Sequence, residues 1–174
     1  MAKLINGPEC QREFDNLPDS NTEGLNEVAE ACRLVAHDLA LPQATESWGL
    51  SYCVLAMDQA VVPRGPLDGD EPFPGQFWNI SPGWNGKFGH FFMAQSGVHF
   101  PNLVYVIADR TVEMLQRDGN ALDRPLCPLH RSGQTHRLVA SFKDHQAVWI
   151  CERSVEARAF PVGDLGTSRV QGTG

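Results

Sequence analysis

The feature that most constrains the fold is an apolar stripe within residues 23–39. Its members recur at the spacing of one face of an α-helix, and they are Leu25, Val28, Ala29, Cys32, Val35, Ala36 and Leu39. Ser20 and Glu23 can form a capping box at the start of this segment, and Pro42 stops a helix at its end. We therefore predict an amphipathic helix over residues 23–39.

The next segment, residues 48–62, fits two different periods. Its apolar residues approximate a helical stripe, while Leu50, Tyr52 and Val54 also alternate as they would in a strand. We predict a short helix that starts near Ser51, with the strand as the alternative.

Beyond a segment rich in Pro and Gly, residues 63–74, β-forming residues dominate the chain. The predicted strands cover residues 76–80, 88–95, 103–108, 135–142 and 147–151, and a shorter one lies near residues 155–160. The two long strands at the end are separated by Lys143-Asp144-His145-Gln146 and look like a hairpin. A short helix is predicted over residues 111–117, before Gly119.

Helices that come first and strands that pair locally are typical of the α+β class. We predict N-terminal helices packed on a mostly antiparallel sheet of four to six strands. The length of 174 residues suits a single domain. Within it, we expect residues 1–20 to form an irregular arm and residues 163–174 a loose tail.

The chain carries 14 Lys and Arg against 21 Asp and Glu, which gives a formal net charge of −7. Binding to phosphates depends on Lys and Arg, so we predict no affinity for nucleic acid and none for an anionic membrane. No apolar run reaches the length of a membrane span, and residues 1–8 lack the apolar core of a signal peptide. The expected location is therefore cytoplasmic, although export by a route without such a signal would leave no mark in the sequence.

The five cysteines are odd in number and irregular in spacing, which favours free thiols over a disulfide framework. Two residues separate Cys127 from His130, and His136 and Cys151 follow farther along. Zinc accepts these ligand types, but structural zinc sites usually show two paired-ligand knuckles, and this chain shows one, with a proline inside it. We therefore predict a loop cysteine beside a solvated histidine, with no metal and no cofactor.

A nucleophile and a base can be drawn from two other segments. Cys53 lies where the predicted short helix begins, and the N-terminus of a helix stabilises the reactive thiolate. His90 follows Gly89 at the start of a predicted strand, and Asn102 or His99 comes near the next strand. A cysteine nucleophile that faces a histidine base, with a third polar group to orient the imidazole, is the arrangement of a thiol hydrolase.

Residues 48–108 resemble the papain-like hydrolases of the NlpC and CHAP kind. That family places a helix-borne cysteine before a strand introduced by Pro-Gly-Asp, and a histidine strand follows. Here Pro74-Gly75-Gln76-Phe77-Trp78 is similar to the strand entry, with Gln76 in place of the acid, and Gly89-His90 is similar to the histidine strand. The resemblance implies hydrolysis of a peptide, protein or cell-wall amide through a thioester.

Two tryptophans support a competing hypothesis. Trp78 and Trp84 flank the turn signal Ser81-Pro82-Gly83. Amphipathic rings on a turn suit contact with a glycan or a partner, and they suit anchoring in the core equally well. The alternative is therefore a non-enzymatic interaction protein, such as a toxin-neutralising, phage or assembly component, which binds a peptide or protein partner through this surface.

Overall fold

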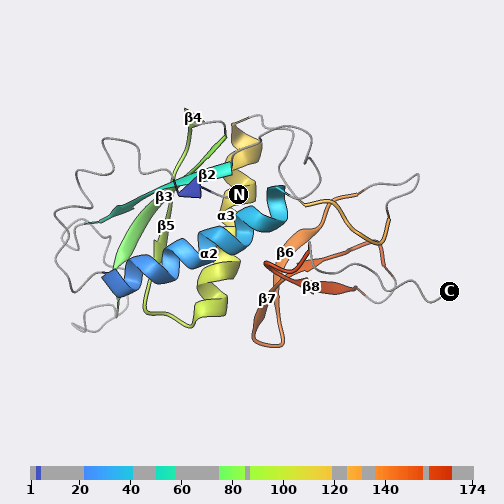
Figure 1. Ribbon diagram of the computed structural model, residues 1–174. Helices are drawn as coiled ribbons and strands as arrows, with labels where there is room; N and C mark the ends of the chain where they lie inside the picture. Colours follow the sequence, from blue (N-terminus) through green and yellow to red (C-terminus); the bar gives the residue numbers. More distant parts are fainter. Residues whose placement is uncertain are drawn as a thin grey trace, which may run out of the picture.

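The structure is a computed structural model of the chain, and it describes residues 3–4, 22–40, 50–57, 75–84, 87–118, 125–130, 136–154 and 157–165. Two helices, α2 (Thr22–Ala40) and α3 (Phe100–Arg117), lie among strands that form two sheets (Figure 1). The predicted α+β class is confirmed. The strands are, however, divided between a larger and a smaller sheet rather than collected in one.

The larger sheet is built around one long antiparallel pair. This pair consists of β2 (Leu50–Ala56) and β3 (Phe77–Trp84). β1 (Lys3–Leu4) lies parallel to β2, while β4 (Lys87–Phe88) and β5 (Phe92–Gln95) both pair antiparallel with β3. Alternate side chains of the central pair are buried, so one face of this sheet forms part of the core; they are Tyr52, Val54, Trp78 and Ile80.

The smaller sheet is antiparallel and consists of β6 (Val139–Lys143), β7 (Gln146–Ile150) and β8 (Ala159–Pro161). The predicted hairpin is confirmed by the pairing of β6 with β7. Its two turn residues, Asp144 and His145, have φ angles of 50° and 62°. Positive φ at both central positions is the signature of a type I′ turn, whose twist matches that of the flanking strands.

The helices fill the space between the two sheets. α3 contacts β3 and β5 on one side and β6 and β7 on the other, and α2 packs against α3 and β2 (Figure 1). The predicted amphipathic helix is confirmed by α2. Its buried apolar side chains are Val28, Ala31, Cys32, Val35, Ala36 and Leu39. Each fully buried aliphatic side chain of this size contributes about 1.5–3 kcal/mol to folding.

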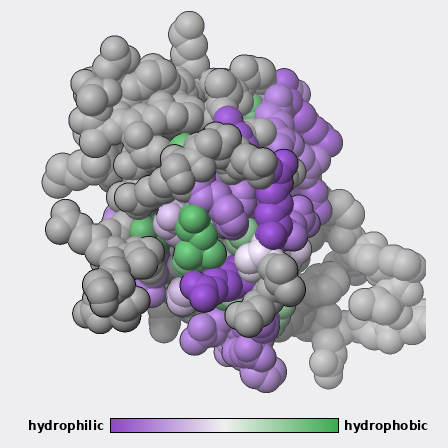
Figure 2. Space-filling view, turned by 90° about the vertical axis from the view of Figure 1, so that its right-hand side faces the viewer, coloured by the Kyte–Doolittle hydropathy of each residue, from purple (hydrophilic) through white to green (hydrophobic). Residues whose placement is uncertain are grey.

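The outer side of the smaller sheet is mostly polar. Figure 2 looks at this side of the molecule, and hydrophilic residues cover most of the coloured surface, with hydrophobic residues in a small area only. On the opposite side, Phe142 of β6 meets Tyr105 of α3 edge to face, with ring centroids 6.3 Å apart. Neither of the described helices is long and apolar enough to cross a bilayer.

Two predicted elements are wrong, each for its own physical reason. Residues 50–56 form strand β2 rather than a helix, because the alternating Leu50, Tyr52 and Val54 face the helices. Residues 103–108 belong to helix α3 rather than to a strand. Because α3 is packed from both sides, its apolar residues form a nearly continuous run, which resembles a buried strand in the sequence.

The predicted strand over residues 88–95 is broken in its middle. β3 pairs with Phe88 through Gly83 and with Phe92 through Ile80. Between these pairs, residues 81–82 face residues 89–91, so the second strand carries one extra residue, which is a β-bulge. The Ser81 hydroxyl donates to the carbonyls of Gly89 and His90, 3.4 and 3.1 Å away, which the bulge leaves without ladder partners.

Both ends of the chain include ordered contacts. Lys3 and Leu4, within the predicted irregular arm, pair with β2. Gly163 and Leu165, at the start of the predicted loose tail, donate their backbone N–H groups to the carboxylate of Asp38. The rest of the arm and of the tail lies outside the described residues.

Candidate metal centre

The structure places Cys53 in a strand, not at the start of a helix. It lies in the middle of β2, opposite Ser81 of β3. Cys53 is also disulfide-bonded, so the expectation that all five thiols are free is wrong at this position. The dipole and free N–H groups of a helix N-terminus, which would favour a thiolate, are therefore not supplied at Cys53 by the described residues.

His90 has a carboxylate partner that the sequence did not indicate. Its Nδ1 lies 2.7 Å from Oδ1 of Asp118, at the C-terminal end of α3, and 59% of the His90 side chain is exposed. Asn102 and His99 stand at the N-terminal end of the same helix. At 1.5 Å per residue, Asn102 is about 24 Å from Asp118 along the helix axis. Neither predicted orienting residue is therefore brought to His90.

The predicted tryptophan surface is wrong for Trp78. This side chain is fully buried, and its Nε1 donates to the Ser96 hydroxyl, 3.0 Å away. The segment between the two tryptophans is part of β3 and not an exposed turn. The side chain of Trp84 lies outside the described part of the chain.

Four other side chains converge on one point. The potential ligand atoms of Cys127, His130, His136 and Cys151 all lie within 4.8 Å of one another. Cys127 Sγ is 3.3 Å from His130 Nδ1, and Cys151 Sγ is 3.1 Å from His136 Nε2 and 3.8 Å from His130 Nδ1. The imidazole centroids are 4.5 Å apart. Cys127 and His130 lie side by side in an irregular segment, as predicted, but Cys127 is buried, His130 is only partly exposed, and two further side chains join them.

These separations match the edges of a small tetrahedron. Zinc bonds of about 2.3 Å to sulfur and 2.0–2.1 Å to nitrogen would place neighbouring ligand atoms about 3.3–3.8 Å apart. The three sulfur–nitrogen distances range from 3.1 to 3.8 Å. These three edges fit a metal ion at the centre of the cluster, whereas a separation as wide as 4.8 Å would have to shorten by about 1 Å.

Backbone hydrogen bonds position the four side chains. A single β-bridge pairs Leu126 with Arg137, and the Cys127 N–H donates to the His136 carbonyl, 3.0 Å away. This bridge sets the first cysteine beside the second histidine. Cys151 comes directly after β7, and its N–H donates to the Arg158 carbonyl, also at 3.0 Å.

The turn after Cys127 provides a favourable environment for a bound thiolate. Burial raises the pKa of Cys127, and the neighbouring thiol of Cys151 raises it further. The backbone N–H groups of Leu129 and His130 point at the Cys127 sulfur and lower its pKa in part. Because two buried thiolates repel each other, this pair needs a cation to be deprotonated together.

The cluster is closed to solvent on its sulfur side. Cys127 and Cys151 are 3% and 0% exposed, and both histidines are partly buried. His136 directs Nε2 at the cluster, so its Nδ1 points away; this buried atom has no hydrogen-bond partner among the described residues. A neutral imidazole with the proton on Nδ1 leaves Nε2 free to bind a metal.

No family model matches this chain, and no curated protein or solved structure matches it either.

Proposed function

We propose that this protein binds one zinc ion through Cys127, His130, His136 and Cys151, and that the metal is structural. The observation that supports this is the convergence of all four ligand atoms within 4.8 Å. Two thiolates and two imidazoles are a ligand set typical of zinc, and the short edges of the cluster fit tetrahedral coordination.

A structural role fits better than a catalytic one because the protein fills all four positions. Catalytic zinc sites usually keep one position open for water or substrate, whereas structural sites are closed. The ligands come from separate segments of the chain, and a metal that joins the segment around Cys127 to the end of β7 would stabilise the sheet of β6, β7 and β8.

We further propose that the protein acts as a non-enzymatic interaction module with a peptide or protein partner. The buried Trp78 takes no part in such a surface. Phe91 and Met93, which are 65% and 45% exposed beside the bulge, are the largest apolar contributions among the described surface residues. The proposal keeps the expectation that neither nucleic acid nor a membrane is the partner, given the net charge of −7.

Metal analysis tests the zinc proposal directly. The protein purified without chelators should contain one zinc per chain by plasma mass spectrometry, and Cys127→Ser and Cys151→Ser should each abolish it. Cys32→Ala is the matched control, because Cys32 is a buried free cysteine outside the cluster. A wild-type protein that takes up no zinc from buffered solution after reduction would refute the proposal.

A second candidate is the thiol hydrolase with Cys53 as nucleophile and His90 as base. It is supported by the 2.7 Å contact of His90 with Asp118, and by Ser81, which faces Cys53 and donates to the His90 carbonyl. In this proposal Asp118 orients the imidazole. A thiol reductant must first free Cys53, whose proton passes to His90. The thiolate attacks the amide carbonyl, His90 protonates the leaving amine, and water then hydrolyses the thioester and restores the thiol.

Alkylation of the reduced protein separates the candidates. If the hydrolase proposal holds, iodoacetamide near pH 6 should label Cys53 first among the five thiols, and His90→Ala should slow the labelling. Asn102→Ala is the control and should change nothing. Labelling of Cys53 no faster than that of the buried Cys32 would rule out the hydrolase.

We propose a cytoplasmic location, because a reducing compartment keeps zinc-binding thiols in the required state. The disulfide at Cys53 is the one observation against it. Alkylation of cell lysates before any reduction, followed by peptide mapping, should find Cys53 as a thiol. A lasting disulfide at Cys53 in fresh lysate would contradict a cytoplasmic location.

A further inference from the structure

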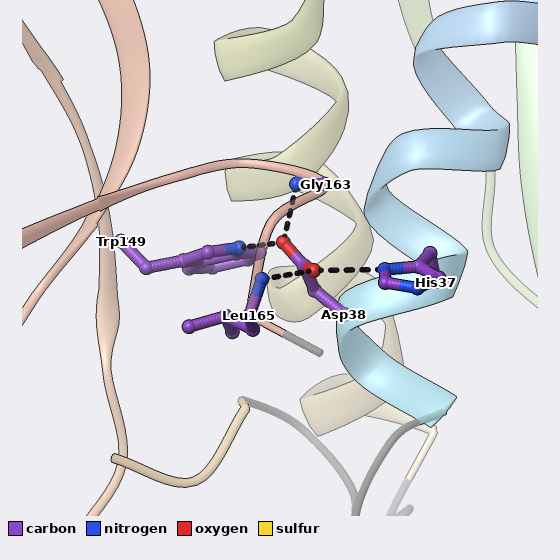
Figure 3. Close-up of polar contacts among 5 residues, drawn as sticks. All are labelled: His37, Asp38, Trp149, Gly163 and Leu165. Carbon is purple, nitrogen blue, oxygen red and sulfur yellow. Dashed lines mark hydrogen bonds and ion pairs between the residues drawn. The ribbon is translucent and has the colours of Figure 1, made fainter. Parts of the chain in front are cut away.

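A buried carboxylate on α2 holds the part of the chain that carries the metal centre. Asp38 is 1% exposed and accepts four hydrogen bonds (Figure 3). Trp149 Nε1 and the Gly163 N–H donate to Oδ2 at 2.8 and 2.6 Å, and the Leu165 N–H donates to Oδ1 at 3.1 Å. The fourth partner is Nδ1 of the neighbouring His37, 3.2 Å from Oδ1.

Three of these partners belong to what we call the C-terminal unit, the described residues 125–130, 136–154 and 157–165. Trp149 lies in the middle of β7, and Gly163 and Leu165 follow β8. One side chain of α2 thus accepts hydrogen bonds from three positions of the C-terminal unit, which also packs against α3 through β6 and β7. Burial raises the pKa of Asp38, while the hydrogen bonds from Gly163, Trp149, His37 and Leu165 each lower it, so the carboxylate depends on these donors for its charge.

The anchor and the metal centre share one strand. Trp149 and Cys151 are two positions apart, so their side chains leave the strand on the same side. Both are 0% exposed. The pairing of β7 with β8 continues through Cys151, whose N–H donates to Arg158. A displacement of β7 that breaks the Trp149 bond therefore also moves the Cys151 sulfur.

Building on the proposed zinc site, we propose that metal binding and the docking of the C-terminal unit on α2 are coupled through Asp38. Asp38 is then a positioning residue for the metal, although it does not touch it. Two states are involved: a zinc-loaded unit docked on Asp38, and a metal-free unit that releases it. Thermodynamic reciprocity requires that if zinc favours docking, docking tightens zinc binding by the same factor.

Each state is stable for a physical reason. In the docked state, the Asp38 carboxylate is desolvated but accepts hydrogen bonds from three separate positions of the C-terminal unit. In the released state, water solvates it fully. Without the metal, the end of β7 loses its link to the segment around Cys127, so the donors are held together less firmly. Zinc thereby regulates how firmly residues 163–165 are held by Asp38 of α2.

Zinc affinity of an Asp38 variant tests the coupling. In Asp38→Asn, the amide oxygen can replace only one of the two carboxylate oxygens, and the amide nitrogen faces a backbone or indole N–H donor, so the anchor is weakened. We expect the Kd for zinc, measured by competition with a chromophoric chelator, to rise at least about tenfold, the range seen when groups that support a metal ligand are removed. Glu30→Gln is the matched control, since Glu30 is an exposed carboxylate on the same helix that pairs with Arg33; its Kd should stay unchanged.

Cobalt substitution supplies a readout that loss of stability alone would not change. The absorption bands of bound Co²⁺ depend on the position of the cysteine sulfurs. They should shift in Asp38→Asn and match the wild type in Glu30→Gln. Unchanged zinc affinity and unchanged bands in Asp38→Asn, with one metal still bound, would overturn the coupling and leave the zinc site intact.

Hydrogen exchange of the wild-type protein covers the case in which Asp38→Asn does not fold. The amides of Gly163 and Leu165 should exchange at least about tenfold faster after zinc removal, while amides in the middle of α2, around Val35, keep their protection. Equal exchange at residues 163 and 165 with and without zinc would refute the coupling. A wild-type protein that binds no zinc at all would instead refute the zinc site, and the coupling with it.

Discussion

Two buried tryptophans make the same hydrogen bond to different acceptors, which allows a matched comparison. Trp149 donates to the carboxylate of Asp38, and Trp78 donates to the hydroxyl of Ser96. Bonds to charged groups contribute about 1.5–3 kcal/mol, and those between neutral groups about 0.5–1.5 kcal/mol. We predict that Trp149→Phe lowers the free energy of unfolding more than Trp78→Phe does, by about 1–2 kcal/mol.

Urea unfolding of the zinc-loaded protein at pH 8 provides the measurement. Both residues are fully buried and the two substitutions remove the same atoms, so the loss of packing is similar. The difference between the two losses of unfolding free energy therefore measures the effect of the acceptor, a carboxylate or a hydroxyl. Equal losses for the two variants would mean that Asp38 carries no charge at this pH.

Two buried acids near each other predict a loss of stability at alkaline pH. Burial raises the pKa of Cys32, and burial, together with the Cys32 charge, raises the pKa of Tyr52 well above 10. A group whose folded pKa lies above its unfolded value stabilises the fold below the unfolded pKa and loses that contribution as the pH rises. The free energy of unfolding should therefore fall as the pH climbs past about 9–10.

The double variant Tyr52→Phe and Cys32→Ala should flatten this fall, even though it is less stable at neutral pH. Tyr52→Phe also removes the 3.1 Å bond to the Thr111 hydroxyl, which explains a constant offset but not a slope. The measurement is urea unfolding between pH 7 and 11. A slope as steep in the double variant as in the wild type would assign the alkaline loss to other groups.

The β6–β7 hairpin carries a local strain that can be removed. Asp144 and His145 adopt the left-handed backbone conformation, which costs most residues about 1–2 kcal/mol and Asp less. Replacing the pair with Asn-Gly, the preferred sequence for this turn, should raise the free energy of unfolding by about 1 kcal/mol and the Tm by about 2–4 °C. Arg33→Gly, in the exposed middle of α2, is the contrast and should lower stability by about 1 kcal/mol. A thermal melt in which Asn-Gly lowers the Tm would exclude the type I′ turn.

An element with a polar face shows its period in the sequence, and an element buried on two sides does not. The stripe of α2 is clear because its opposite face is polar, whereas the β6–β7 hairpin was predicted from β-forming residues around a short turn segment, since residues 147–149 of β7 are all buried. In contrast, α3 packs between two sheets, so its residues 103–108 have no polar face to reveal the helical period. The choice between helix and strand at Ser51 also depended on tertiary contacts, since the segment fits both periods.

The sequence shows the four candidate metal ligands, but it does not show that they lie close together in the fold. Only Cys127 and His130 are neighbours in the sequence, and the other two ligands arrive through a single β-bridge and the end of β7. Long-range pairing of this kind leaves no spacing rule to detect. The same holds for Asp118, which is 28 residues from His90 and reaches it only because α3 runs the length of the larger sheet. Composition and spacing therefore could not show which of these side chains form a site.

For the whole molecule, the zinc proposal predicts that stability follows the concentration of free metal. A single site that binds only the folded state adds about 1.4 kcal/mol for each tenfold rise of free zinc above its Kd. The Tm should therefore rise by about 3–5 °C per decade of buffered zinc. The Cys127→Ser variant should show a constant Tm, as should the wild type in a magnesium series. A wild-type Tm that does not respond to zinc would contradict a metal that supports the fold.

The Asp38 anchor also affects how the chain acquires its structure during synthesis. Its partners Trp149, Gly163 and Leu165 come 111, 125 and 127 residues later. At a translation rate of about 5–20 residues per second, helix α2 waits roughly 6–25 s before the Asp38 carboxylate can be buried against them. Contacts this distant in sequence also slow folding, because a long loop must close before they form. A ribosome stalled near residue 140 would therefore hold a chain in which α2 is complete but Asp38 still faces water, a state that chaperones and proteases can distinguish from the finished protein.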